Sequence, residues 1–148
     1  MATTLRQSTC QSLIERIGRL QPDSRPRWGR MTASRMVCHL GDQLRLALGE
    51  IEVPATRSPL RFTPIKQLLI YFLPWPKGKI KAPPVALATD PGPWEKDVAT
   101  LRALLERFAG FEPAGSWAPH PFFGTMSRRL WAGLTRRHFD YHLRQFGV

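Results

Sequence analysis

The chain has 148 residues, 43% of them apolar, so it can bury one hydrophobic core but is too short for two ordinary domains. Lysine and arginine total 22 against 11 aspartates and glutamates, which gives a formal net charge of +11. Such a charge fits nucleic acid, an anionic membrane surface, an acidic substrate, or simply a solvated basic surface. The two cysteines, Cys10 and Cys38, exclude a disulfide framework and a Cys-x-x-Cys motif.

No segment of the sequence has the pattern of a secretion signal or a membrane span. The N-terminal residues lack a continuous apolar stretch. The longest apolar run, residues 68–75, is far shorter than the ~20 residues that a spanning helix needs. We therefore expect a cytoplasmic protein in a reducing compartment.

Two amphipathic helices are predicted in the first third of the chain. The first runs from about Leu5 to Leu20, with apolar residues at steps of three and four. The second follows Thr32, a suitable N-cap, and ends at Gly49. Its apolar stripe consists of Met36, Leu40, Leu44 and Leu48.

Residues 50–92 are rich in proline. Seven of the 14 prolines lie between Pro54 and Pro84. A short helix is predicted from Ile65 to Phe72, and residues 74–84 are expected to be extended or irregular, because proline lacks an N–H group and disfavours helix in the residue before it. A connection this long in a compact domain is usually functional or lies over the core.

Two further helices are predicted in the last third of the chain. Asp90 is the expected N-cap of the third, with Pro91 in its first position and Gly110 at its end. Ser127 is the expected N-cap of the fourth.

Four long amphipathic helices without a strand pattern predict an all-α fold. The expected architecture is a four-helix bundle that forms a single domain over residues 1–148. The proline-rich stretch would then be a long crossover between the second and third helices.

The clearest chemical signal is the pair His138 and His142. Their spacing puts both imidazoles on one face of a helix, where both can reach a point about 2 Å from each ring nitrogen. His39 lies in the second helix among apolar neighbours, where an unpaired imidazole would cost free energy. If the two helices lie side by side, the three residues form a metal site with an open coordination position, which suits a catalytic metal. The alternative is that they are ordinary surface or core-edge histidines, because such pairs are common and the glutamate of zinc proteases is absent.

Four other residues have expected roles in or around the predicted site. Asp42, one turn after His39, is a candidate to accept the outer N–H of a metal-bound imidazole. Asp140 is expected to face away and to pair with an arginine. Cys38 lies about 100° around the helix from His39, which favours a buried structural thiol. His120, between two prolines, is expected to be a loop residue whose role is packing, and a place at the rim of a pocket is its candidate functional role.

Several stretches form a recognisable pattern. They are Trp28-Gly-Arg-Met-Thr-Ala, the single His39, His120-Pro-x-Phe-Gly124, and the His138 and His142 pair followed by Leu-Arg144-Gln145-Phe-Gly. This pattern resembles the DinB-like (YfiT-like) superfamily of metal-dependent enzymes, in an uncharacterised bacterial branch. The resemblance implies a four-helix bundle with a long crossover, often a homodimer, with zinc or nickel on His39, His138 and His142. Some members of the superfamily are thiol-dependent transferases or isomerases.

Two classes of function follow from these observations. The first is a metal-dependent enzyme acting on a small molecule such as a low-molecular-weight thiol, by thiol-dependent transfer or metal-assisted hydrolysis. A neutral three-histidine site favours an anionic ligand such as a thiolate. Arg144 and Gln145 are candidates to hold the substrate or shape the site, and Arg144 could equally be an ion-pair partner. The second, less favoured class is a non-catalytic binding or stress-response module whose basic surface meets nucleic acid or another polyanion. No membrane partner is expected.

Overall fold

The structure, a computed structural model, describes residues 4–54 and 57–148. In these residues the fold is all-helical, as the sequence predicted, and contains no β-strand. No helix in them is both long and apolar enough to cross a bilayer. The five α helices are α1 (Gln7–Ile17), α2 (Ala33–Ala47), α3 (Ile65–Tyr71), α4 (Trp94–Ala109) and α5 (Arg128–Gln145), and two short 3-10 helices are η1 (Pro59–Arg61) and η2 (Pro84–Leu87).

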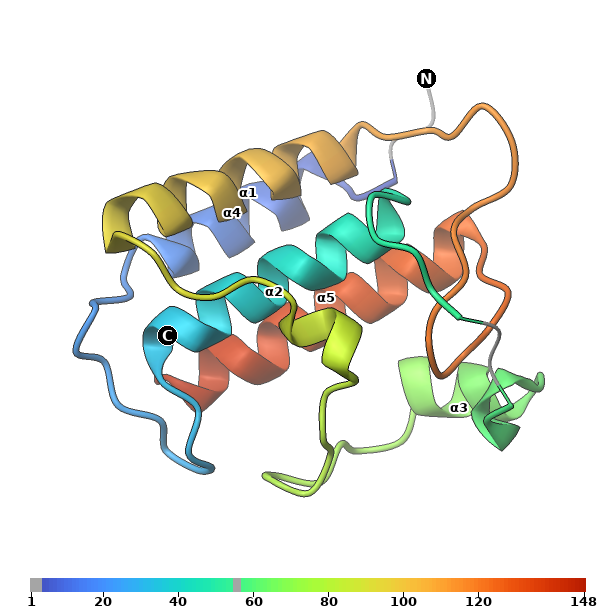
Figure 1. Ribbon diagram of the computed structural model, residues 1–148, viewed down its shortest axis with the longest axis horizontal. Coiled ribbons are helices and arrows are strands. Elements are labelled where there is room, and N and C mark those ends of the chain that lie inside the picture. The colour runs from blue at the N-terminus through green and yellow to red at the C-terminus, as the bar shows by residue number, and fades with distance from the viewer. Residues whose placement is uncertain (1–3, 55–56) are drawn as a thin grey trace.

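The four long helices contact one another in pairs. Helix α4 packs on α1 and α2, and α5 packs on the same two helices from the other side. Figure 1 shows α1 beside α4 and α2 beside α5, with the shorter α3 near the first turns of α5. The side chains between these helices are apolar and fully buried, and their burial is the main favourable term in folding. The largest are Ile17, Met36, Leu40, Leu44, Leu101, Leu105, Phe108, Trp131, Phe139 and Leu143.

Two of the three predicted N-caps are confirmed. The hydroxyl of Thr32 accepts the N–H of Arg35 at the start of α2, and that of Ser127 accepts the N–H of Leu130 at the start of α5. The third prediction is wrong, because α4 begins at Trp94 after Pro93 and not at Pro91. The cause is Pro93, which disfavours helical backbone in the residue before it.

Asp90, the expected cap of α4, has a different partner. Its exposed carboxylate accepts a hydrogen bond from Arg35 at 3.2 Å. The N–H of Gly92, just before the helix, is bound instead by the carboxylate of Asp97 at 2.7 Å. Asp97, in the first turn of α4, therefore supplies the acceptor at the N-terminus that Asp90 was expected to supply.

The predicted short helix in the proline-rich region is confirmed as α3, which packs against α5. The Tyr71 hydroxyl donates to the carbonyl of Arg129, and a Cβ atom at Gly133 would clash with the Tyr71 ring. The buried Lys66 donates to the carbonyls of Phe123 and Thr125. Helix α3 is thus fixed to both α5 and the loop before it.

Asp42 joins α2 to the segment that follows η2. Its fully buried carboxylate accepts the N–H of Thr89 at 2.9 Å, the hydroxyl of Thr89 at 2.5 Å and the guanidinium of Arg45 at 3.0 Å. The end of the proline-rich region is therefore held against α2 by one buried charge.

Replacing Asp42 with Ala should lower the free energy of unfolding by about 3 kcal/mol, because the N–H and hydroxyl of Thr89 and the charge of Arg45 lose their acceptor. Asp140 is the matched control, since its carboxylate is 38% exposed and pairs with two arginines. Asp140→Ala should cost less than about 1 kcal/mol. Urea unfolding of both variants measures the difference, and equal losses would contradict the anchoring role of Asp42.

Candidate metal centre

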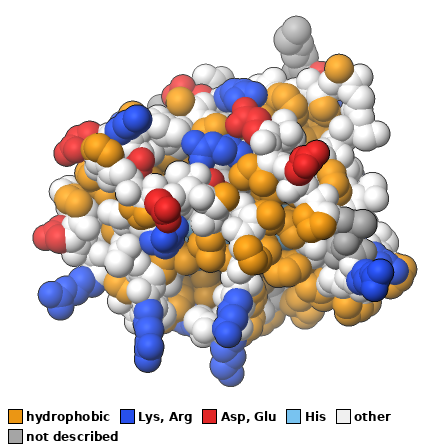
Figure 2. Space-filling view, viewed as in Figure 1, with side chains coloured by type: hydrophobic (Ala, Val, Ile, Leu, Met, Phe, Trp, Pro, Cys, Tyr) orange, Lys and Arg blue, Asp and Glu red, His pale blue; other side chains and the backbone are white. Residues whose placement is uncertain are grey.

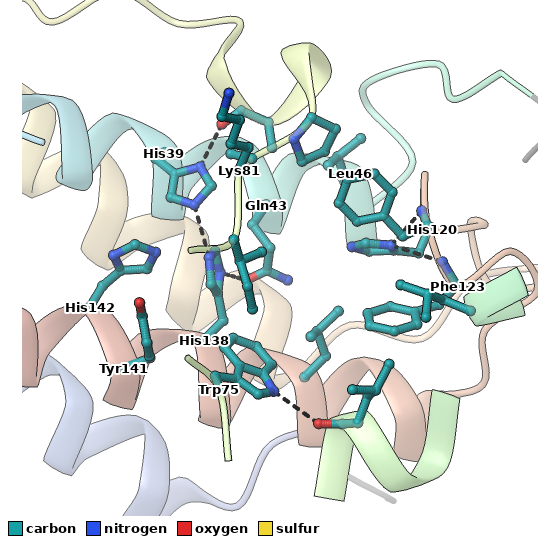
Figure 3. A pocket seen from close by; sticks show the side chains of 18 of the residues that line it. His39, Gln43, Leu46, Trp75, Lys81, His120, Phe123, His138, Tyr141 and His142 are labelled. Carbon is teal, nitrogen blue, oxygen red and sulfur yellow. Dashed lines mark hydrogen bonds between the residues drawn. The ribbon is translucent and has the colours of Figure 1, made fainter. Parts of the chain in front are cut away.

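Three histidines meet where α2 and α5 lie side by side. His39 is in the middle of α2, and His138 and His142 lie one turn apart on α5. One ring nitrogen of each residue lies within 4.8 Å of those of the other two, and Nε2 of His39 is 2.9 Å from Nε2 of His138. His39 and His142 are buried and His138 is half-buried. Figure 3 shows the three rings pointing toward one another.

The outer nitrogens of His39 and His142 are each bound to an oxygen. Nδ1 of His39 lies 2.7 Å from the carbonyl of Ala86, which can only accept, so Nδ1 carries the proton. Nδ1 of His142 lies 2.8 Å from Oε1 of Gln145. The amide of Gln145 is oriented by its Nε2, which donates to the carbonyl of Trp28 at 2.9 Å. Nε2 is therefore the unprotonated nitrogen of both imidazoles.

The outer nitrogen of His138 has a weaker partner. Its Nδ1 lies 3.5 Å from Oε1 of Gln43, whose own Nε2 donates to the hydroxyl of Thr135 at 3.1 Å. This amide is oriented in the same way as that of Gln145. Because Nδ1 of His39 carries the proton, Nε2–H of His138 donates to Nε2 of His39 in the 2.9 Å contact. When the His138 proton moves to Nδ1, toward Gln43, all three histidines direct an unprotonated Nε2 toward one another.

Burial keeps these imidazoles neutral. Loss of solvent lowers the pKa of His39, lowers that of His138 well below its usual value, and lowers that of His142 to about 3. The positive charge that each would carry lowers the pKa of its neighbours further. At neutral pH the site is therefore a group of neutral nitrogen ligands.

This set of donors fits a divalent transition metal. Imidazole nitrogens lie about 2.0–2.1 Å from zinc, so two of them at the tetrahedral angle around one ion are about 3.3 Å apart. Nε2 of His39 and Nε2 of His138 are 2.9 Å apart in their hydrogen bond, so the two rings need to separate by only about 0.4 Å to hold the ion. The outer N–H groups donate to oxygens, as those of metal-bound histidines usually do. Three protein ligands leave at least one coordination position for another molecule.

The three histidines lie in the wall of a cavity of about 430 Å³. The remaining walls are mostly apolar and come from α3, the proline-rich segment and the loop before α5. Two aromatic residues of the cavity lie beside the triad. The ring centroid of Tyr141 is 5.1 Å from that of His142, and that of Trp75 is 6.1 Å from that of His138. The cavity is lined, among others, by Leu46, Leu60, Leu69, Trp75, Ile80, Pro83, Phe123 and Leu134.

The other predicted site residues divide into those near the triad and those away from it. Gln145 contacts His142, whereas Arg144 is 72% exposed and pairs with Asp140. The expected pairing of Asp140 with an arginine is confirmed, and Arg16 is its second partner. Asp42 contacts Thr89 and Arg45. The outer N–H of His39, which Asp42 was expected to bind, donates instead to the carbonyl of Ala86.

Cys38 is buried and stands apart from the three histidines. Its Sγ lies 3.6 Å from the carboxylate of Asp97. Burial, together with the charge of Asp97, raises the pKa of the thiol to about 11, so the thiolate is disfavoured at neutral pH. This agrees with the expected structural role.

Two groups that bind the triad were missed in the sequence. Gln43 lies one turn after His39 on the same helix, and this spacing could have identified it. The carbonyl of Ala86 has no sequence signal, because any residue supplies a backbone oxygen and only the path of the chain brings it there.

His120 lines the same cavity from the loop before α5. Its Nδ1 accepts the backbone N–H groups of Phe122 and Phe123 at 3.0 and 3.2 Å. Burial lowers its pKa to about 3. It is therefore neutral at physiological pH and shapes the turn in which it lies.

The low pKa of His120 predicts a pH-dependent stability. As the pH falls below 6.5, the unfolded chain gains a proton at this residue and the folded chain does not, so the free energy of unfolding falls by about 1.4 kcal/mol per pH unit. His120→Asn removes this contribution, and its free energy of unfolding should fall less steeply between pH 6 and about 4. Urea unfolding at several pH values compares the slopes, and parallel curves would contradict the prediction.

Comparison with known proteins places the chain in a family. No curated protein and no solved structure gave a match. A family model with the description "Protein of unknown function (DUF1569)" matches residues 60–147. The matched part includes His120, His138, His142 and most of the cavity wall, and it begins after α2 with His39. Because the match covers more than half of its residues, the chain belongs to the DUF1569 family of proteins of unknown function.

Proposed function

We propose that this protein is a divalent-metal-dependent enzyme that holds its metal on His39, His138 and His142. The observation that carries the proposal is the orientation of the three imidazoles. Their outer nitrogens lie toward oxygens and their inner nitrogens converge as neutral donors. Nε2 of His39 and Nε2 of His138 share one proton at 2.9 Å, and a cation in its place would be bound by both nitrogens together with that of His142.

The reaction would take place where the triad meets the cavity. A bound metal supplies a Lewis acid there. The cavity walls exclude water and hold the apolar part of a small substrate. Because the three histidines are neutral, the site favours a substrate with an anionic oxygen or a thiolate. Thiol-dependent transfer with a low-molecular-weight thiol and metal-assisted hydrolysis are the two reactions that fit.

We propose zinc or nickel as the metal, because imidazole ligands suit both. The same proposal places the chain in the DinB-like superfamily, as a single-domain four-helix bundle over residues 1–148 with a proline-rich crossover. The contacts of α1, α2, α4 and α5 support that architecture. The free thiols of Cys10 and Cys38 support a cytoplasmic location.

A homodimer is part of the proposal. Apolar side chains on and beside α3 are exposed to solvent, among them Phe72 at 74% and Phe62 at 54%. Ile65 and Leu68 belong to the same surface. A second copy would cover this surface, which is otherwise costly to leave in water.

The non-catalytic alternative depends on a free basic surface. Figure 2 shows Lys and Arg side chains along the lower edge of one face, with acidic side chains higher up. Two arginines of α5 already have partners, since Arg137 donates to carbonyls of α3 and Arg144 pairs with Asp140. Because these two arginines are bound by other groups of the chain, polyanion binding is the weaker candidate.

The metal content of untagged protein tests the proposal. Wild type should carry close to one metal ion per chain, and His142→Ala should lose it, because two imidazoles hold a metal far less tightly than three. His120→Asn is the control, since it changes a buried histidine outside the triad and should keep the metal. Protein that stays metal-free after titration with zinc and nickel would sink the proposal.

Gln145→Leu tests the support of the site. The variant keeps the three ligands but removes the oxygen that binds Nδ1 of His142. Metal affinity should fall by about 10- to 100-fold, as is usual when such a partner is lost. Competition with a chromophoric chelator gives the affinity, and an unchanged value would show that Gln145 does not orient His142.

A further inference from the structure

We propose that His120 is a fixed hydrogen-bond donor to the substrate, and that the cavity therefore takes a molecule with two polar ends. One end would bind the metal at the triad. The other would present an uncharged acceptor oxygen, such as an amide or ketone carbonyl, to Nε2–H of His120. An apolar body would join them. This inference rests on the proposed function and narrows its substrate class.

The tautomer of His120 is set by its backbone contacts. Nδ1 accepts two N–H groups, from Phe122 and Phe123, so it must be the unprotonated nitrogen and Nε2 must carry the proton. The turn around the ring is closed by two backbone hydrogen bonds with Gly124, at 2.8 and 2.9 Å. Gly124 has φ of 63°, a conformation that glycine adopts without strain. The donor is therefore held in one orientation.

The donor has no protein partner and faces the cavity. The side chain is 92% buried, since its relative exposure is 8%, and Nε2 makes no hydrogen bond with the described residues. Among those residues only Nε of Arg102 is a fully buried side-chain nitrogen or oxygen without a partner, so Nε2 of His120 is open to the cavity. Figure 3 shows the ring of His120 among the side chains that line the cavity.

The surroundings decide which acceptor fits. Burial holds the pKa of His120 at about 3, so the residue offers a dipole and no positive charge. Its ring packs beside Phe123 and Trp131, at centroid distances of 4.7 and 5.5 Å. An anion loses more hydration at an apolar wall than a neutral oxygen does, and the neutral His120 offers it no counter-charge, whereas a neutral oxygen gains the hydrogen bond at a lower cost. A ligand with a methyl group at this place would leave the donor unpaired and bind less well.

Two series of probes test the inference on cobalt-loaded protein. The first is a homologous series of ω-mercaptoalkanamides, and the second consists of n-alkanethiols of the same lengths. The thiolate-to-cobalt absorption band reports binding at the metal end. At the best-fitting length, wild type should bind the amide about tenfold more tightly than the alkanethiol, as one added buried hydrogen bond allows.

His120→Asn is the decisive variant. Its side-chain oxygen can take the place of Nδ1 and accept the same two backbone N–H groups, as asparagine does in turns. Its NH2 group is bonded to the same carbon as that oxygen, so it does not bring an N–H to the position of Nε2. The melting temperature at neutral pH should stay close to that of wild type. The amide and the alkanethiol of the same length should then bind about equally well, while the absorption band persists. An equal preference in wild type and variant at every length would overturn the inference and leave the metal site standing.

A second readout separates this inference from the proposed function. If no thiol gives an absorption band, the metal proposal fails, and the His120 donor is then judged in metal-free protein by NMR. There the imidazole N–H resonance of His120 should move when the amide is added and stay in place with the alkanethiol. A resonance that responds to neither probe would overturn the inference.

Discussion

Three imidazoles can share one buried corner only if each outer nitrogen finds an oxygen, and this requirement connects distant parts of the chain. The carbonyl of Ala86 serves His39 and reaches it because η2 packs on α2. Gln145 serves His142 and is itself oriented by the loop before α2, through the carbonyl of Trp28. Without these acceptors, the desolvated N–H groups would oppose burial of the rings. The buried hydrogen bonds around the triad therefore set the orientation of the three imidazoles and of their inner nitrogens.

The proline-rich region is the part of the chain that turns this corner into a cavity. Prolines keep it from continuing as a helix. It therefore crosses α2 and α5 as an irregular segment and lines the cavity beside the three histidines. Helix α5 holds this segment through Tyr141, whose hydroxyl accepts the N–H of Gly78 at 3.1 Å. Asp42 fixes its far end through Thr89. The same segment thus provides an apolar surface for a ligand and the carbonyl that orients His39, so cavity shape and triad geometry depend on each other.

Sequence periodicity was enough to predict the helices and the histidines, because both repeat with the turn of a helix. Met36, Leu40 and Leu44 mark the buried side of α2, and His138 and His142 share one side of α5. The start of α4 differs from the prediction because Pro93 disfavours helical backbone at Gly92, and this outweighs the capping preference of Asp90. The partner of His39 could not be predicted, since the contact joins residues 47 positions apart through a backbone oxygen. Local patterns thus identify the candidate ligands, and only the path of the irregular segment shows what orients them.

The most direct test of the three-histidine site is X-ray absorption spectroscopy of the protein loaded with one equivalent of zinc. The account predicts three imidazole nitrogens at about 2.0–2.1 Å, together with a light-atom ligand in the open position. It also predicts that addition of a small thiol replaces that ligand with a sulfur at about 2.3 Å. A zinc shell with sulfur from Cys38 or Cys10 before any thiol is added, or one with fewer than three imidazoles, would contradict it.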